Sequence, residues 1–306
     1  MITSQADDLD SRVRAAAMTW LRRRCTPEDP IVRRDELLGF QFEGRTFPLI
    51  DNQLGIRKPQ GMTAALSILT TYTSDMARAP YDDAVGSDGL LRYKFQGNPR
   101  HYTNVGLRLA FELSVPLMWF YGIKQSIYLP FFPVWIIAVE PEKSQVAVAL
   151  DDAQRHLAID GTASQIERHY AERITKQRLH QPVFRQRVIQ AYETACTICR
   201  LRHRSLLDAA HIIPDRHVRG VPAISNGLAL CKIHHAAYDQ NIIGIRPDYA
   251  IEVRTDILEE IDGPMLKHGI QEMNGHRITL PRRRSDRPDQ TLLEERYHIF
   301  RTTVYT

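Results

Sequence analysis

The stretch that decides the fold is Cys196-Thr-Ile-Cys199 together with Cys231-Lys-Ile-His234. Each pair separates two metal-binding side chains by two residues, and the second pair ends in an imidazole instead of a thiolate. Two such pairs are typical of a closed tetrahedral Cys₃His site for structural zinc. The competing interpretation, buried free cysteines beside a surface histidine, explains one pair but not two pairs at matching spacing. The sequence therefore predicts a zinc-stapled unit built on Cys196, Cys199, Cys231 and His234.

Three further polar residues follow in order around this predicted zinc scaffold. The apolar run Leu206–Pro214 contains His211, the stretch Asn226-Gly-Leu-Ala-Leu-Cys231 begins with an amide side chain, and His235 directly follows the second pair. A lone histidine on an apolar strand is usually a core residue. Here the order His, Asn, His inside and beside the two pairs favours a functional site.

This segment resembles the HNH endonuclease family, whose pattern runs Cys-x₂-Cys, an apolar run ending in His, Asn-Gly-Leu-x-Leu-Cys, and His. The resemblance implies a ββα-metal fold, in which a β-hairpin and one helix embrace a catalytic divalent ion, Mg²⁺ or Mn²⁺. It implies that His211 ends the first strand as general base and that Asn226, in the connecting loop or second strand, orients it. His235 would open the helix and bind the ion. Neutral imidazole near pH 7 suits both histidine roles.

The sequence departs from the family's pattern at Ala210, where many members have an aspartate as a second metal ligand. The nearest upstream acid is Asp208, and alternation along a strand places Asp208 and His211 on opposite faces, so Asp208 would ligate only if the backbone bends. Asp239, four residues after His235 and on the same helix face, is the alternative candidate. A cap, salt bridge or hydrogen bond is an equally good interpretation of either aspartate.

Composition shifts along the chain predict an α+β protein of four segments. These are an N-terminal helix (1–30), a mainly β domain (31–150), a helical linker (151–195) and a C-terminal segment (196–306), which the resemblance implies is an HNH endonuclease domain with a C-terminal extension. Short apolar runs such as 131–139 and 145–150, broken by Gly, Pro, Asn and Asp, indicate strands in the second segment. Apolar positions at helical spacing in 165–176 and 183–192 indicate the linker helices.

The second segment contains Gly55-Ile-Arg-Lys-Pro59, Tyr81-Asp-Asp83 and Asp88-Gly-Leu-Leu-Arg-Tyr93. With these pieces it resembles, over about residues 45–150, the SRA (YDG) reader of modified bases, a PUA-like β fold. The resemblance implies a pocket for a flipped base, with an aromatic platform and acceptors for the base edge. The candidate pocket residues are Tyr81, Asp82, Asp83, Asp88 and Tyr93. Hairpin turns and strand edges use the same residue types for structural reasons, so that alternative stays open.

Composition limits the remaining possibilities. A chain of 306 residues with 43% hydrophobic residues can bury one or two cores. The sequence has no run of about 18 apolar residues and begins without a signal-like segment, so we expect a cytoplasmic protein without a membrane partner. The net charge of +4 is too small to predict a polyanion partner, because basic runs such as Arg22–Arg24 and Arg282–Arg284 are often solvated faces.

Together the two resemblances imply a modification-dependent restriction endonuclease. It would use structural zinc and one catalytic divalent ion to cut double-stranded DNA near a modified base such as 5-methylcytosine or 5-hydroxymethylcytosine. A single ββα-metal site cuts one strand, so a homodimer is expected. One alternative is an HNH nickase or mobile-element nuclease acting on unmodified DNA. Another is a non-catalytic zinc module that binds nucleic acid, against which the presence of both His211 and His235 argues.

Overall fold

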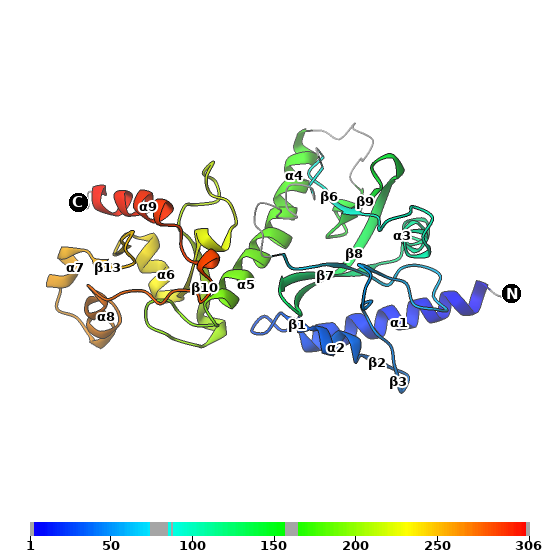
Figure 1. Cartoon of the computed structure of the whole chain (residues 1–306), viewed down its shortest axis with the longest axis horizontal. Helices are drawn as coiled ribbons and strands as arrows, with labels where there is room; N and C mark the ends of the chain where they lie inside the picture. Colours follow the sequence, from blue (N-terminus) through cyan, green and yellow to red (C-terminus); the bar gives the residue numbers. More distant parts are fainter. Residues whose placement is uncertain (1–2, 74–84, 87, 157–164, 304–306) are drawn as a thin grey trace. The chain divides into compact units, whose positions relative to one another are not determined.

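The computed structural model describes residues 3–73, 85–86, 88–156 and 165–303, and the chain divides into two compact units, 1–183 and 184–306 (Figure 1). Each unit contains helices and strands, which confirms the predicted α+β class. Among the described helices, none is long and apolar enough to cross a membrane. The division into four segments and the PUA-like topology of the second segment stay predictions.

The N-terminal unit is built on one seven-stranded sheet. The strands of this unit are β1 (Val32–Arg33), β2 (Gln41–Phe42), β3 (Arg45–Thr46), β4 (Ile56–Arg57), β5 (Ser67–Thr70), β6 (Leu91–Lys94), β7 (Leu117–Lys124), β8 (Ile127–Glu140) and β9 (Gln145–Ala149), of which all but β2 and β3 belong to the sheet. Its helices are α1 (Thr3–Arg24), α2 (Arg34–Leu38), α3 (Tyr102–Glu112) and α4 (Gln165–Thr175), with the 3₁₀ turns η2 (Pro141–Lys143) and η3 (Gln154–His156) and the π-helical segment η4 (Lys176–His180). The strand order is β4-β5-β7-β8-β9-β6, β1 pairs with β8, and β2 and β3 form a separate hairpin.

Strand β7 lies in the interior of this sheet, and its first seven residues are all buried. Successive side chains on a strand point to opposite faces, so such a run requires cover on both faces. Trp119 belongs to one core with Leu107 of α3. Phe120 belongs to a second core with Leu21 of α1. Helices α1 and α3 therefore cover opposite faces of the sheet.

The predicted strands 131–139 and 145–150 correspond to β8 and β9. Strand β8 changes partner along its length, pairing with β7 up to Val134 and with β9 from Trp135 onward. Helix α3 interrupts the segment predicted to be mainly β. Its buried residues Leu107 and Ala110 are three apart, which is the spacing of one helical face. The helix has only eleven residues, so its apolar positions are hard to distinguish from the apolar runs of the neighbouring strands.

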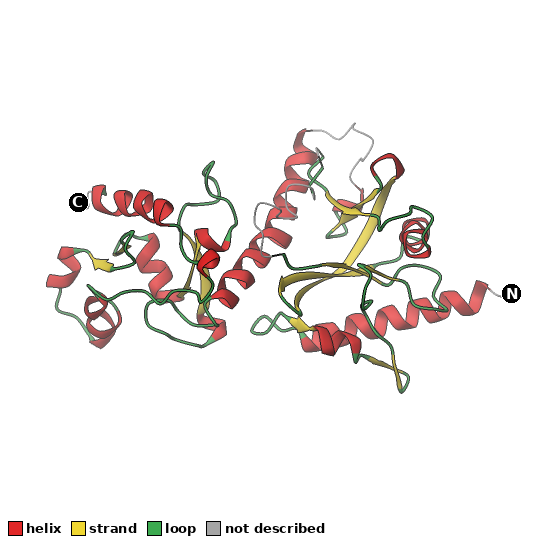
Figure 2. Cartoon of the chain, in the orientation of Figure 1, coloured by secondary structure: helices red, strands yellow, loops and turns green. Residues whose placement is uncertain are grey.

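The C-terminal unit consists of short strands among helices and loops (Figure 2). Helix α5 (Gln181–Ala191) contains the boundary between the units. The other helices are α6 (Lys232–Asp239), α7 (Thr255–Glu259), α8 (Pro264–Gly269) and α9 (Gln290–Thr302), with the 3₁₀ turns η5 (Arg204–Leu206), η6 (Ile224–Asn226), η7 (Gln271–Met273) and η8 (Arg284–Asp286). The strands are β10 (Leu207–His211), β11 (Gly227–Cys231), β12 (Ile243–Ile245) and β13 (Ile251–Val253).

Strands β10 and β11 form an antiparallel hairpin in regular register, from Leu207 opposite Cys231 to His211 opposite Gly227. Helix α6 begins directly after β11 with Cys231 as its N-cap residue, so two strands and a helix follow one another as one unit. Helix α5 packs closely on the hairpin. A Cβ atom at Gly227 would lie 2.4 Å from Cγ2 of Val188, and only glycine permits that approach.

Candidate functional site

Four metal-binding side chains converge at the hairpin of the C-terminal unit. Cys196 and Cys199 lie in the loop after α5, Cys231 ends β11, and His234 lies in the first turn of α6. Their ligand atoms all lie within 4.8 Å of one another. Nδ1 of His234 lies 3.1 Å from Sγ of Cys231 and 3.5 Å from Sγ of Cys196. The structure thus brings together the four residues predicted to hold structural zinc.

The donor set fits a tetrahedral ion. Zinc–sulfur bonds of about 2.3 Å give a tetrahedron with an edge of about 3.8 Å, and the Sγ atoms of Cys199 and Cys231 are 4.0 Å apart. Nε2 of His234 lies 2.7 Å from the carbonyl oxygen of Gly269. Because a carbonyl can only accept, Nε2 carries a hydrogen, so in the neutral imidazole that binds a metal the lone pair belongs to Nδ1, which faces the cysteines. Gly269 ends α8, and its role had no signal in the sequence because a backbone carbonyl belongs to no residue type.

The electrostatics of the cluster also favour a cation. Hydrogen bonds from the thiols of Cys199 and then Cys231 lower the pKa of Cys196. The hydrogen bond to Cys196, followed by that to Cys231, raises the pKa of Cys199. Without a cation, ionisation of one thiol therefore opposes ionisation of its neighbour. A divalent cation would relieve this opposition, and zinc binds cysteine in the thiolate form.

His211 ends β10, as the resemblance implies, and its ring stacks on Phe184 of α5. The ring centroids are 4.0 Å apart and the planes are inclined by 14°. Phe184 is buried and also contacts the backbone position opposite His211, because a Cβ atom at Gly227 would lie 3.0 Å from its Cζ. Helix α5 therefore supplies a wall for the predicted general base. The motif alone did not reveal this wall, since Phe184 precedes it in the chain.

Asn226 lies in the loop directly before β11, and its side chain is buried. Its Nδ2 donates to the carbonyl oxygens of Ile213 and Val221, each at 3.0 Å, and its Oδ1 accepts from the backbone N–H of Ile213 at 2.9 Å. Its own carbonyl oxygen accepts from the N–H of Ile212, the residue after His211. Both amide hydrogens are thus used to hold the loop that leaves His211. This geometry makes Asn226 a positioning residue that acts through the backbone.

His235, the predicted ligand of the catalytic ion, lies between two carboxylates. Its Nδ1 lies 3.7 Å from Oδ2 of Asp208, and its Nε2 lies 3.3 Å from Oδ2 of Asp239. The register of β10 is regular through Asp208, so Asp208 reaches His235 without the backbone bend expected from the sequence. The two aspartates face different ring nitrogens. An ion bound through Nδ1 would therefore be near Asp208, and one bound through Nε2 near Asp239.

The charges at this group differ between the two aspartates. Burial opposes ionisation of Asp208, but its ion pair with His235, the N–H of Ala209 and the charge of Arg185 lower its pKa to about 2. Nε of Arg185 lies 3.0 Å from Oδ1 of Asp208. The ion pair with Asp208 raises the pKa of His235, with burial opposing and Asp239 assisting. The side chain of Asp239 is 58% exposed and that of Asp208 41%, so Asp208 is held more firmly.

The described residues of the predicted base pocket have contacts within the N-terminal unit. The hydroxyl of Tyr93 lies 2.8 Å from the carbonyl oxygen of Gly55 and 3.1 Å from that of Leu69, and burial raises the pKa of Tyr93. Both carboxylate oxygens of Asp88 accept from Arg92, at 3.1 and 2.7 Å. Tyr81, Asp82 and Asp83 lie outside the described residues. A base-reading role for these residues stays a prediction.

Residues 196–246 match the family model described as HNH endonuclease. No curated protein matches the chain. Among solved structures, the chain is similar to one titled "Modification dependent TagI restriction endonuclease", with 15% sequence identity, 80% of this chain and 84% of that chain covered, and a TM-score of 0.29. The family match and the geometry of the hairpin and α6 together support a nuclease role for the C-terminal unit, whose segment 196–246 is similar to an HNH endonuclease domain.

Proposed function

We propose that the protein is a metal-dependent DNA endonuclease whose C-terminal unit hydrolyses phosphodiester bonds. The observation that carries this proposal is the placement of His211, Asn226 and His235 on one β-hairpin and helix, beside a Cys₃His cluster and within the HNH endonuclease match. A module that only binds nucleic acid would need the cluster but has no need of histidines outside it.

In the proposed reaction, His211 takes a proton from the attacking water while the water oxygen bonds to phosphorus and the bond to the leaving oxygen breaks; the leaving oxygen then takes a proton from solvent water. The stack on Phe184 restricts the imidazole to one plane, and Asn226 holds the loop after it. A divalent ion, Mg²⁺ or Mn²⁺, would supply neutralisation of charge on the scissile phosphate. His235 and Asp208 would hold this ion, because Asp208 comes from the same strand as His211 and is the less exposed aspartate.

The test is the variant His211→Ala, with His298→Ala as the control because His298 is an exposed histidine of α9. Loss of a general base lowers the rate by about 10² to 10⁴-fold. We expect His211→Ala to lose cleavage by that factor and to keep DNA binding, since the base acts in the transition state. His298→Ala should cleave normally. Near wild-type turnover by His211→Ala would contradict the proposed chemistry.

We further propose that the N-terminal unit makes cleavage depend on a modified base. The pieces Gly55–Pro59, Tyr81–Asp83 and Asp88–Tyr93 support this proposal through their likeness to the SRA reader. Cleavage of plasmids that carry cytosine, 5-methylcytosine or 5-hydroxymethylcytosine tests it directly. We expect a clear preference for modified plasmid and, from a homodimer, a linear product. Equal cleavage of all three plasmids would favour the alternative nuclease for unmodified DNA, and nicked circles alone would favour a nickase.

A further inference from the structure

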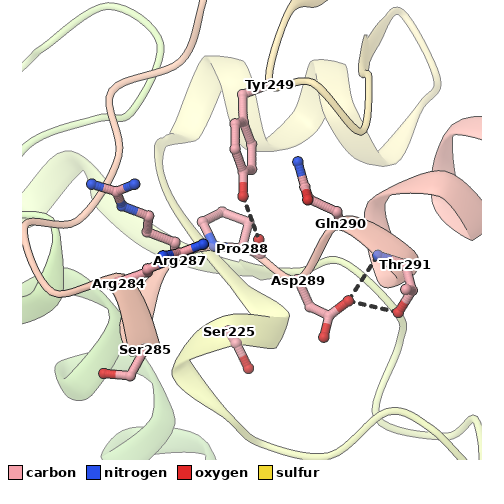
Figure 3. Close-up of a pocket in the computed structure, with 9 residues that line it drawn as sticks. All are labelled: Ser225, Tyr249, Arg284, Ser285, Arg287, Pro288, Asp289, Gln290 and Thr291. Carbon is pink, nitrogen blue, oxygen red and sulfur yellow. Dashed lines mark hydrogen bonds between the residues drawn. The ribbon is translucent and has the colours of Figure 1, made fainter.

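A cavity of about 600 Å³ lies in the C-terminal unit, between the loop before β11 and the segment that leads into α9 (Figure 3). Arg284 and Arg287 line one side of it, Asp289, Gln290 and Thr291 the other, and Ser225 lies below them. Pockets for small organic ligands are mostly apolar with a few polar groups. This lining is almost entirely polar or charged, so it suits a charged, hydrated ligand.

The positive charge of the cavity remains available to a ligand. Within the described residues, the guanidinium group of Arg284 has no hydrogen-bond or ion-pair partner, and that of Arg287 uses only its Nε, which donates to the carbonyl oxygen of Pro281 at 3.3 Å. Guanidinium groups bind phosphate through two parallel hydrogen bonds. The two arginines therefore offer terminal N–H groups that are hydrogen-bonded to no acceptor in the part of the chain that the structure describes.

The carboxylate of Asp289, the acidic group that lines the cavity, is hydrogen-bonded within the protein through one of its two oxygens. Oδ1 of Asp289 accepts from the N–H and the hydroxyl of Thr291 and from the N–H of Leu292, as the N-cap of α9. The hydroxyl of Thr291 and these N–H groups, with burial opposing and Arg219 assisting, lower the pKa of Asp289. Its charge is offset by the positive end of the helix. The balance of the cavity is therefore one that attracts an anion.

The cavity is connected to the predicted catalytic loop. The N–H of Asp289 donates to the carbonyl oxygen of Ser225 at 2.9 Å, and Ser225 precedes Asn226. Asn226 in turn accepts from the N–H of the residue after His211. A chain of one hydrogen bond, one peptide link and a second hydrogen bond thus joins the cavity wall to the strand end that carries the predicted base. An anion bound here would be held in fixed relation to His211.

We propose that this cavity binds a backbone phosphate of the DNA strand beside the scissile phosphate, with Arg284 and Arg287 as the phosphate ligands. The inference rests on the proposed endonuclease function and adds to it a substrate contact in the C-terminal extension. The contact is independent of sequence and of base modification, because it involves only the phosphate. It positions the strand at His211 and takes no part in the chemistry.

The experiment measures the affinity of the full chain for a short unmodified DNA duplex between about 50 and 200 mM salt, without added divalent ion. Each phosphate contact contributes about 0.9 to the slope of log affinity against log salt concentration. We expect Arg284→Ala and Arg287→Ala each to reduce that slope by about 0.9. Arg283→Ala is the matched control, because Arg283 is exposed and adjacent in sequence but does not line the cavity.

An unchanged slope for Arg284→Ala, or an equal reduction for Arg283→Ala, would overturn the proposal in favour of no contact or of a diffuse basic surface. Arg284 is exposed, so its loss should leave the thermal unfolding temperature unchanged, which separates lost contact from lost fold. The binding slope is measured without cleavage. A reduced slope beside undiminished cleavage by His211→Ala would therefore keep the phosphate site and reject the proposed catalytic role.

Discussion

The imidazole of His211 lies flat against the ring of Phe184, with centroids 4.0 Å apart and an interplanar angle of 14°. The two rings come from β10 and α5, which the hairpin register and the glycine at position 227 bring together. A flat stack holds the imidazole in one plane, because the ring of Phe184 blocks rotation out of that plane. The orientation of the predicted base therefore depends on an apolar side chain of α5.

Replacement of Phe184 by leucine should separate orientation from burial. The variant keeps an apolar side chain against Gly227 but removes the stacking surface, so we expect the turnover number to fall by about 10-fold to 100-fold. Unfolding free energy should fall by only about 1–2 kcal/mol. Phe300→Leu is the control, because Phe300 is a buried phenylalanine of α9 that contacts Gly244. Equal turnover losses in both variants, measured on plasmid DNA, would show that the effect is general destabilisation.

Zinc removal should unfold the C-terminal unit while the N-terminal unit stays folded. Structural zinc contributes about 10–16 kcal/mol to the folding of small domains, so Cys199→Ser should abolish cleavage. In circular dichroism, the loss of helical signal on heating should be smaller for this variant, because its C-terminal unit is already unfolded. Cys25→Ser is the control, because Cys25 is the one cysteine outside the cluster. All three tryptophans of the sequence belong to residues 1–183: Trp20, Trp119 and Trp135. The melting temperature measured by tryptophan fluorescence should therefore be unchanged. Active protein without zinc in elemental analysis would rule out this role.

The sequence marks the candidate residues of the HNH-like segment, whereas it does not mark the side chains and carbonyls that surround them. Spacing and residue type mark His211, Asn226 and the Cys₃His cluster, because donor atoms at fixed intervals on a hairpin and helix leave a pattern in one dimension. The wall formed by Phe184 and the carbonyl of Gly269 depend on tertiary packing of α5 and α8. Neither has a fixed interval from the motif, so neither could be predicted from it.

The aspartate that binds the catalytic ion together with His235 can be identified by comparing Asp208→Asn with Asp239→Asn. Each change removes a charge while keeping the shape of the side chain, so each serves as the matched control of the other. We expect Asp208→Asn to raise the Mg²⁺ or Mn²⁺ concentration for half-maximal cleavage by about 10-fold to 100-fold, and Asp239→Asn to raise it less, because Asp239 is the more exposed. A larger effect of Asp239→Asn would place the ion at Nε2 of His235.

The N-terminal unit was predictable in its strands and less so in its topology. The apolar runs of β8 and β9 stand out in the sequence, and the structure buries all of β9 but only part of β8. The order β4-β5-β7-β8-β9-β6 includes the parallel pair β5 and β7 and the late pairing of β6 with β9. Such pairings join residues far apart in the chain, and alternation along each strand contains no information on which strand will be its neighbour.

Tyr93→Phe tests whether the hydroxyl of Tyr93 stabilises the fold or recognises the base. Its hydroxyl lies within hydrogen-bonding distance of the carbonyl oxygens of Gly55 and Leu69. Removal of a buried hydrogen-bond donor costs about 1–3 kcal/mol, so tryptophan fluorescence should show a lower melting temperature. The aromatic ring remains, so the preference for modified plasmid should persist below that temperature. An unchanged melting temperature together with a lost preference would assign the hydroxyl to the base.

Acid should destabilise the N-terminal unit through His180, which lies in the π-helical segment after α4. Burial, and then the charge of Lys176, lower the pKa of His180 from 6.5 to about 4. The folded unit therefore binds fewer protons than the unfolded chain between these pH values. The contribution of His180 to the free energy of unfolding is fully present above pH 6.5 and is lost as the pH falls toward 4. Because the side chain is only half-buried, we expect a loss of about 2 kcal/mol rather than more.

The measurement is urea unfolding of the full chain, followed by tryptophan fluorescence at several pH values. The three tryptophans report on residues 1–183 alone, so changes in the C-terminal histidines do not enter the signal directly. His180→Gln removes the titrating group but keeps a polar side chain of similar length, and its stability should depend less on pH between 4 and 6.5. His169→Gln is the control, because His169 is an exposed histidine of α4. Identical pH profiles for the wild type and His180→Gln would show that protonation of His180 costs the fold nothing.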